Sequence, residues 1–152
     1  MFRWLQNQPR LLEAAYDATH NLLRPLRRFL KSGGALEAVF VRGEELTKGP
    51  IFDCRMCGQC ILHSTGMTCP MTCPKNLRNG PCGGVRANGH CEVIPTMRCV
   101  WTQAYERSLE MKHYAGELTN LQPPVNHRLQ GTSAWINDFT GVAEQTPAGW
   151  VK

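Results

Sequence analysis

Eight cysteines are the residues of this sequence best suited to chemistry, and all of them lie in one short stretch. They are Cys54, Cys57, Cys60, Cys69, Cys73, Cys82, Cys91 and Cys99. The first three have the spacing C-x2-C-x2-C, which is typical of iron–sulfur ligation because a tight loop points three thiolates at three irons of one cubane. Cys69 and Cys73 are each followed by proline, as the fourth ligand is in ferredoxin sequences. The spacing therefore predicts cysteines that hold metal clusters.

The count of eight cysteines fits two [4Fe–4S] clusters, two zinc sites of four thiolates each, one cluster with zinc or structural cysteines, or four disulfides. Disulfides are disfavoured because the first 31 residues do not have the pattern of a secretory signal, which points to a reducing compartment. Zinc ribbons use two separated C-x2-C pairs, and this sequence has a single triple instead. We expect all eight cysteines to bind two [4Fe–4S] clusters, with zinc as the alternative cofactor.

The sequence leaves the division of these ligands between the clusters open. Our first assignment gives Cys54, Cys57 and Cys60 one late ligand, Cys99, with Cys69, Cys73, Cys82 and Cys91 around the second cluster. Exchange of the fourth ligand, as in ferredoxins, is an equal alternative.

Other polar residues of the cysteine region are expected to have supporting roles. His63 and His90 could replace a thiolate, but eight cysteines already suffice. Lys75, Arg78 and Arg86 could donate to sulfides or attract an anionic partner, although solvated loop charges are the simpler interpretation. Because the sequence has no acid–base pair, Ser–His–Asp order, phosphate loop or dinucleotide motif, we expect no catalytic site of its own.

The elements that must position these cysteines contain few large apolar residues of their own. Residues 50–99 hold all eight cysteines, six of the 14 glycines and five of the ten prolines. A segment with so little to bury cannot order itself through a hydrophobic core, so thiolate ligation must contribute to its folding. Beyond Cys99, Trp101 and Tyr105 are spaced one helical turn apart, and we expect both to pack against a cluster.

Helical patterns flank the cysteine region. Residues 9–31 predict a helix that Pro9 begins, Pro25 kinks and residues 32–34 end. Its apolar stripe is either core or a docking surface, and consists of Leu12, Ala15, Thr19, Leu22, Leu26 and Leu30. Residues 36–41 fit a strand or a helical turn, and a second helix is predicted from Val100 to near Gly116.

The remaining tail has no periodicity. Isolated apolar residues there predict an extended segment laid on another surface, in contact with a partner; they are Trp135, Ile136, Phe139, Val142 and Trp150. The expected fold is a small, irregular, α-rich domain organised by metal clusters. Its parts are an N-terminal helical extension (1–50), the cysteine-rich domain with its closing helix (51–118) and the tail (119–152).

The net charge of +5 is concentrated at the N-terminus, where residues 1–31 carry +4. The rest has 11 basic and 10 acidic side chains, which argues against nucleic acid as a partner. The basic stretch is a solvated helix face or a surface for an acidic partner. No stretch approaches the roughly 20 apolar residues that cross a membrane. We therefore expect a cytoplasmic protein with neither nucleic acid nor membrane as partner.

Residues 52–109 resemble the cysteine-rich methylenetetrahydrofolate reductase C-terminal domain. The resemblance rests on CRMCGQC at 54–60, the turn NGPCGG at 79–84 and MRCVWTQAYER at 97–107. Such domains occur fused to the reductase or as a separate small subunit, which in two-subunit, acetogen-type reductases is the iron–sulfur partner of a flavin-bearing TIM-barrel subunit.

The resemblance implies an iron–sulfur subunit that relays electrons to or from a flavin-containing, methylenetetrahydrofolate reductase-like partner in folate one-carbon metabolism. Such a chain is a non-catalytic subunit of a hetero-oligomeric oxidoreductase complex. Relatives also occur beside methyltransferase and corrinoid proteins. The alternative is therefore a structural iron–sulfur or zinc adaptor in a folate or corrinoid methyl-transfer complex.

Overall fold

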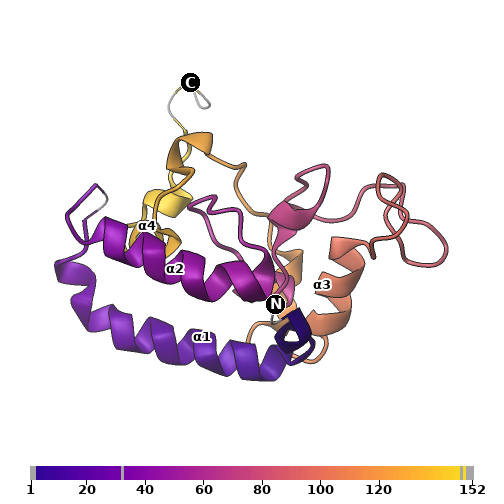
Figure 1. Cartoon of the computed structure of the whole chain (residues 1–152), viewed down its shortest axis with the longest axis horizontal. Coiled ribbons are helices and arrows are strands. Elements are labelled where there is room, and N and C mark those ends of the chain that lie inside the picture. Colours follow the sequence, from indigo (N-terminus) through magenta and orange to yellow (C-terminus); the bar gives the residue numbers. More distant parts are fainter. Residues whose placement is uncertain (1–2, 32, 148, 150–152) are drawn as a thin grey trace.

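The protein is a set of helices around irregular cysteine-bearing loops (Figure 1). The computed structural model describes residues 3–31, 33–147 and 149, and within them the elements are helical, with no strand. The α-helices are α1 (Pro9–Leu23), α2 (Glu37–Phe52), α3 (Val100–Ser108) and α4 (Ala134–Phe139). The 3-10 turns are η1 (Arg3–Asn7), η2 (Arg24–Arg28), η3 (His63–Thr65), η4 (Pro70–Thr72), η5 (Ala115–Thr119), η6 (His127–Leu129) and η7 (Val142–Glu144). The helix-rich character expected from the sequence is confirmed.

Helix α1 begins at Pro9, as predicted, because a proline in the first turn costs no intrahelical hydrogen bond. The α-helix ends at Leu23 and continues as the 3-10 turn η2, in which Pro25 is an early residue. Proline cannot donate to the preceding turn, so the chain changes its helix type at that point. The predicted kink is therefore a break between two elements.

The predicted apolar stripe is buried only in part. Leu30 is buried and Leu12 packs against a core cluster, whereas Leu22 is 72% exposed and Leu26 is 46% exposed. Glu13 is also buried, and its carboxylate accepts the backbone N–H groups of residues 112–114. These donors fix the rotation of the helix, and Tyr16 follows on the same side, stacked on Trp135 at a centroid distance of 5.2 Å.

Helix α2 is longer than the short run at residues 36–41 suggested. Its buried positions are Glu44, Lys48 and Phe52, spaced four residues apart on one face. Two of these three side chains are charged, so the apolar pattern of the sequence does not indicate the buried face. The helix ends at Phe52. The next residue, Asp53, has a left-handed conformation (φ 52°) that turns the chain into the cysteine loop.

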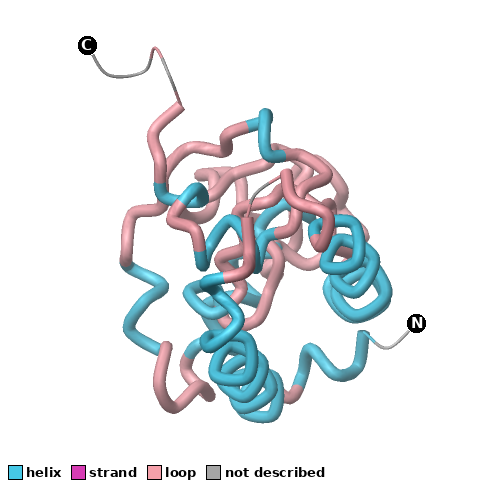
Figure 2. Tube along the Cα trace, turned by 90° about the vertical axis from the view of Figure 1, so that its left-hand side faces the viewer, coloured by secondary structure: helices cyan, strands magenta, loops and turns pink. Residues whose placement is uncertain are grey.

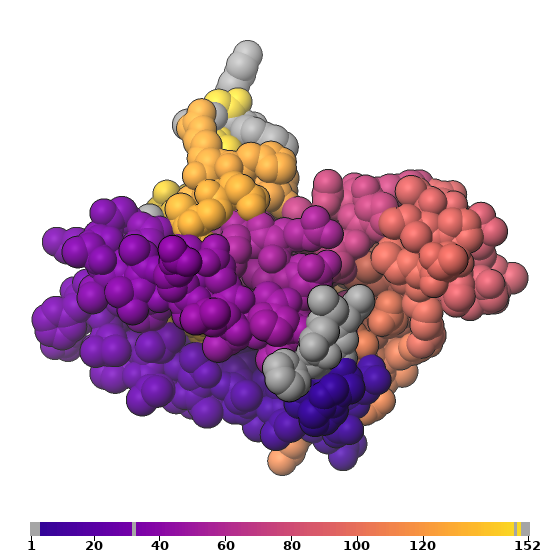
Figure 3. Space-filling view, viewed as in Figure 1, coloured from indigo at the N-terminus to yellow at the C-terminus, as the bar shows by residue number. Residues whose placement is uncertain are grey.

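Helix α3 is confirmed, although it ends at Ser108 rather than near Gly116. The tail is not simply extended: Ile136 in α4 is fully buried and packs within this chain. In Figure 3 the orange C-terminal residues lie along the upper edge of the purple surface formed around α2. The predicted contact with a partner remains a prediction, and Trp150 lies outside the described residues.

The hydrophobic core is divided into two small clusters, each of which includes cysteines. One cluster consists of Phe52, Leu62, Met67 and Met111, with Cys60 and Cys69 packed against it. The other consists of Cys99, Trp101 and Ala104. Figure 2 shows how much of the trace consists of loops, with helices around them. Among the described residues, no helix combines the length and the apolar composition that a membrane span requires.

Candidate metal centre

None of the eight cysteines forms a disulfide, and they fall into two groups of four, each lining one cavity. The first group is Cys54, Cys57, Cys60 and Cys69, and its cavity has an empty volume of about 420 Å³ with the mouth included. The second group is Cys73, Cys82, Cys91 and Cys99, around an empty volume of about 320 Å³. The fold therefore gathers cysteines that are up to 26 residues apart in the chain.

This division corrects the assignment made from the sequence, because Cys69 and Cys99 exchange places. Cys69 joins the first group because the chain turns back through η3, where the Met67 N–H donates to the Leu62 carbonyl at 2.9 Å. Cys99 joins the second group because its N–H donates to the Gly89 carbonyl at 2.9 Å, beside an antiparallel bridge between His90 and Arg98. These pairings bring Cys99 back towards Cys91.

The loop of the first group directs backbone amides at its sulfur atoms. The Met56 N–H lies 3.4 Å from the Cys54 Sγ, and the amides of Leu62 and Met71 donate in the same way to Cys60 and Cys69. In each case the donor follows the cysteine by two residues. Such amides favour thiolates, which makes the arrangement suitable for ligands of an iron–sulfur cluster.

While the sulfurs carry protons, burial raises their pKa values more than these amides lower them. It raises the pKa of the Cys54 thiol to about 11 and that of Cys69 to about 12, and it also raises the pKa of Cys60. A metal that bound to these three sulfurs would have to displace their protons.

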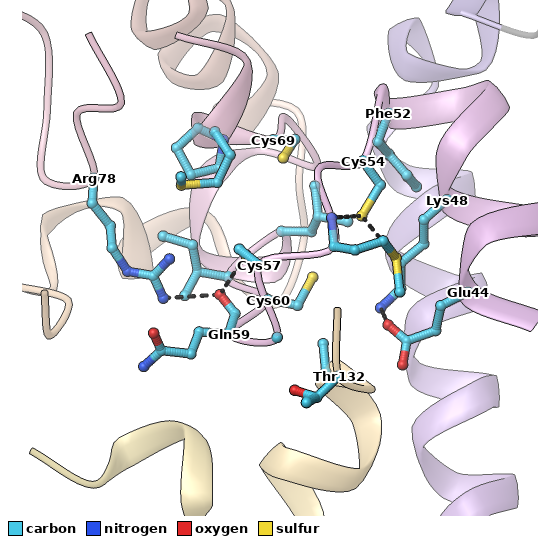
Figure 4. A pocket seen from close by; sticks show the side chains of 17 residues that line it. Glu44, Lys48, Phe52, Cys54, Cys57, Gln59, Cys60, Cys69, Arg78 and Thr132 are labelled. Atoms are coloured by element: carbon cyan, nitrogen blue, oxygen red, sulfur yellow. Dashed lines mark hydrogen bonds and ion pairs between the residues drawn. The ribbon is translucent and has the colours of Figure 1, made fainter. Parts of the chain in front are cut away.

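A C-terminal segment, residues 126–143, holds the loop of the first group in place (Figure 4). Gln59 is almost fully buried; its amide donates to the Ala143 carbonyl at 2.8 Å and accepts from the Asn126 N–H at 2.6 Å. The Asn137 amide donates to the Gly58 carbonyl at 2.9 Å. No spacing or motif identified Gln59 or Asn137 as parts of the site.

An ion pair on α2 lies on one side of this loop. Lys48 donates to Glu44 at 2.6 Å, and both side chains are buried. Glu44 also accepts from the Ser133 hydroxyl at 2.6 Å and from the backbone N–H of Trp135 at 3.2 Å, which joins α2 to α4. Burial lowers the pKa of Lys48, but the nearby Cys60 and Glu44 outweigh it and raise that pKa. The ammonium group therefore keeps its charge beside the cavity.

Arg78 lies on the opposite side of the loop and corrects the expectation of a solvated charge. Its side chain is buried, with 7% exposure, and its Nη2 donates to the Gln59 carbonyl at 2.9 Å. Its Nε and Nη1 are also buried, and neither has a hydrogen-bond partner among the described residues. Burial lowers the pKa of the guanidinium, whereas Cys57 and Cys60 oppose this effect. A buried cation with two unpaired donors fits an anionic group in the cavity.

The second group has a more exposed charged edge. Lys75 and Glu92 form an ion pair beside Cys82, whose sulfur lies 3.5 Å from the Glu92 carboxylate. The turn before Cys82 is held by Asn79, whose side chain both donates to and accepts from the backbone of Gln122.

The two histidines lie outside both cysteine cavities. His63 pairs with Glu117 at 3.4 Å, and His90 Nδ1 contacts the Pro95 carbonyl at 2.8 Å. Trp101 lines the second cavity and is buried, as expected, whereas Tyr105 is 57% exposed and does not line it.

The donor set as a whole fits two metal clusters. Each cavity is lined by four cysteine sulfurs, and the first also has amide donors and a buried cation with two unpaired N–H donors, which suit a group of net negative charge. Within the described ranges, no three His, Cys, Asp or Glu side chains already stand close enough together to ligate a single metal ion.

Comparison with known proteins identifies the family. Residues 34–128 match the family model described as methylene-tetrahydrofolate reductase C terminal. No curated protein and no solved structure matches the chain. The matched residues include α2, α3 and both cysteine groups, whereas α1 and α4 lie outside the match. The chain therefore belongs to the methylene-tetrahydrofolate reductase C-terminal family.

Proposed function

We propose that this chain is the iron–sulfur subunit of a complex with a flavin-bearing, methylenetetrahydrofolate reductase-like protein, and that it relays electrons to or from that flavin. The observation that supports this most strongly is the arrangement of eight free cysteines in two groups of four, each around its own cavity. Four thiolates are the usual ligand set of one [4Fe–4S] cluster, and such clusters supply one-electron transfer when bound.

The residues around the first group would contribute to the relay in three ways. The four cysteines would hold the cluster, and the amides of Met56, Leu62 and Met71 would donate to the sulfurs. The C-terminal segment would keep the loop rigid through Gln59 and Asn137, so that its ligands need not rearrange when the charge changes.

The partner class follows from the family rather than from a surface of this chain. The family description names methylene-tetrahydrofolate reductase, whose chemistry requires a source or a sink of electrons. The N-terminal basic stretch and the exposed side chains of Leu22, Leu26 and Phe29 are available for contact with such a protein.

The test is spectroscopic. The full chain is purified without oxygen, and its visible absorption and EPR spectra are recorded before and after addition of a strong reductant. The relay predicts iron and sulfide, a broad visible band that bleaches on reduction, and an EPR signal in the reduced protein. Zinc without iron, or clusters that no reductant reduces, would contradict the relay and favour a structural adaptor. As a second step, mixing the reduced chain with the flavoprotein should bleach the flavin absorption.

A further inference from the structure

The charges around the two cysteine groups differ, and Arg78 causes the difference. The charged residues lining the first cavity are Glu44, Lys48 and Arg78, which sum to one positive charge. Those lining the second cavity are Lys75 and Glu92, which sum to zero. Since Glu44 neutralises Lys48 at 2.6 Å, the uncompensated charge at the first cavity is the guanidinium of Arg78.

The environment of Arg78 makes this charge effective. Its side chain is 93% buried, and Nε and Nη1 have no partner among the described residues. Figure 4 shows its guanidinium beside Cys57 and Gln59, across the loop from Lys48. A charge in such surroundings acts over short distances with little screening by water, whereas Lys75 and Glu92 are each more than a third exposed.

We propose that Arg78 raises the reduction potential at the first cysteine group above that at the second, so that an electron entering either group resides at the first. The inference rests on the proposed iron–sulfur function. Reduction adds one negative charge to whatever the four thiolates hold, and a buried cation with two unpaired N–H donors stabilises that added charge. Arg78 is thus a tuning residue that acts on the ligands without being one of them.

The test is an EPR-monitored redox titration of the full chain, isolated without oxygen. The wild type is compared with Arg78→Gln, which removes the charge, and with Arg78→Lys, which keeps it. Cys69→Ser and Cys82→Ser identify which signal belongs to which group. The matched control is Arg55→Gln, because Arg55 lies between Cys54 and Cys57 in the loop of the first group but has a side chain 60% exposed and paired with Asp53 at 3.5 Å.

The first group should have the higher midpoint in the wild type. Arg78→Gln should lower the ratio of reduced to oxidised first group at fixed solution potential at least tenfold, which is a shift of 59 mV for one electron. Arg78→Lys and Arg55→Gln should change this ratio less than threefold. A higher midpoint at the second group, an unchanged ratio in Arg78→Gln, or equal shifts in Arg78→Gln and Arg78→Lys would overturn the proposal.

Two further results separate this proposal from others. If Arg78→Gln loses the EPR signal of the first group altogether, the proposal is decided by two other measurements. These are the order of the two midpoint potentials in the wild type and the midpoint potential of the first group in Arg78→Lys. If the wild type contains no iron, the proposed function itself fails, which is distinct from a wild type that has two clusters of unshifted potential.

Discussion

The ion pair between Glu44 and Lys48 provides a sharp test of how the helices hold the first cysteine group. Lys48 is 9% exposed and Glu44 is 4% exposed, and they are joined at 2.6 Å. Glu44→Gln removes the negative charge while its side-chain oxygen can still accept from Ser133 and Trp135. The substitution therefore isolates the charge of Lys48 in a buried position.

The expected cost follows from the burial of the pair. Removing one partner of a buried ion pair typically costs about 3–5 kcal/mol, because the other charge stays buried without compensation. We expect about 3 kcal/mol for Glu44→Gln, the lower end of that range, because the glutamine can keep the hydrogen bonds from Ser133 and from the Trp135 backbone. Lys48→Met added to Glu44→Gln should recover most of the loss, to within about 1 kcal/mol of the wild type.

The assay is urea unfolding of the full chain followed by far-ultraviolet circular dichroism, without oxygen and at neutral pH. The single variants and the double variant complete a double-mutant cycle, and equal slopes against urea would show that the unfolded states are comparable. A loss below about 1 kcal/mol for Glu44→Gln, or a double variant no more stable than Glu44→Gln alone, would show that the buried charge of Lys48 does not depend on Glu44.

Two other predictions concern the backbone around the site and its response to pH. Gly58→Ala should destabilise the chain by roughly 2–4 kcal/mol, because Gly58 has φ +72° and an added Cβ would overlap the Leu129 carbonyl oxygen. Gly43→Ala, with open space around the added atom inside α2, is its control and should stabilise slightly; equal urea midpoints for the two variants would contradict this account. Burial would raise the pKa of Glu13, but three backbone N–H donors hold it below 4.5, so its stabilising effect is present above pH 4.5 and is lost as the pH falls further. The urea midpoint of Glu13→Gln should therefore fall less than that of the wild type between pH 7 and pH 4. Equal falls in the two proteins would exclude a stabilising contribution of the Glu13 carboxylate.

The sequence indicates which residues line the candidate site better than it indicates how they are arranged. The C-x2-C-x2-C spacing and the Cys-Pro pairs identify the cysteines because ligand type and local loop geometry are encoded over a few residues. The starts of α1 at Pro9 and of α3 after Cys99 could be predicted for the same reason, since both depend on local patterns.

The features that the sequence could not predict depend on contacts between distant segments. The buried face of α2 is partly charged, so its apolar residues, such as the 77% exposed Leu46, do not mark the inner side. The placement of Cys99 beside Cys91 depends on pairing across residues 89–99. Arg78 lies in a loop with glycine and proline, and nothing in the neighbouring sequence signals its burial. That burial involves a distant residue, because the Gln59 carbonyl accepts a hydrogen bond from the guanidinium.

Metal analysis can show whether each group of four cysteines holds one cluster, as we propose. Iron, acid-labile sulfide and zinc are measured in the anaerobically isolated full chain, in Cys60→Ser/Cys69→Ser and in Cys91→Ser/Cys99→Ser. We expect about eight irons and eight sulfides per chain in the wild type, and about four of each in either variant. Zinc in place of iron, about four irons in the wild type, or a variant that loses all of its iron while still folded would contradict the proposal.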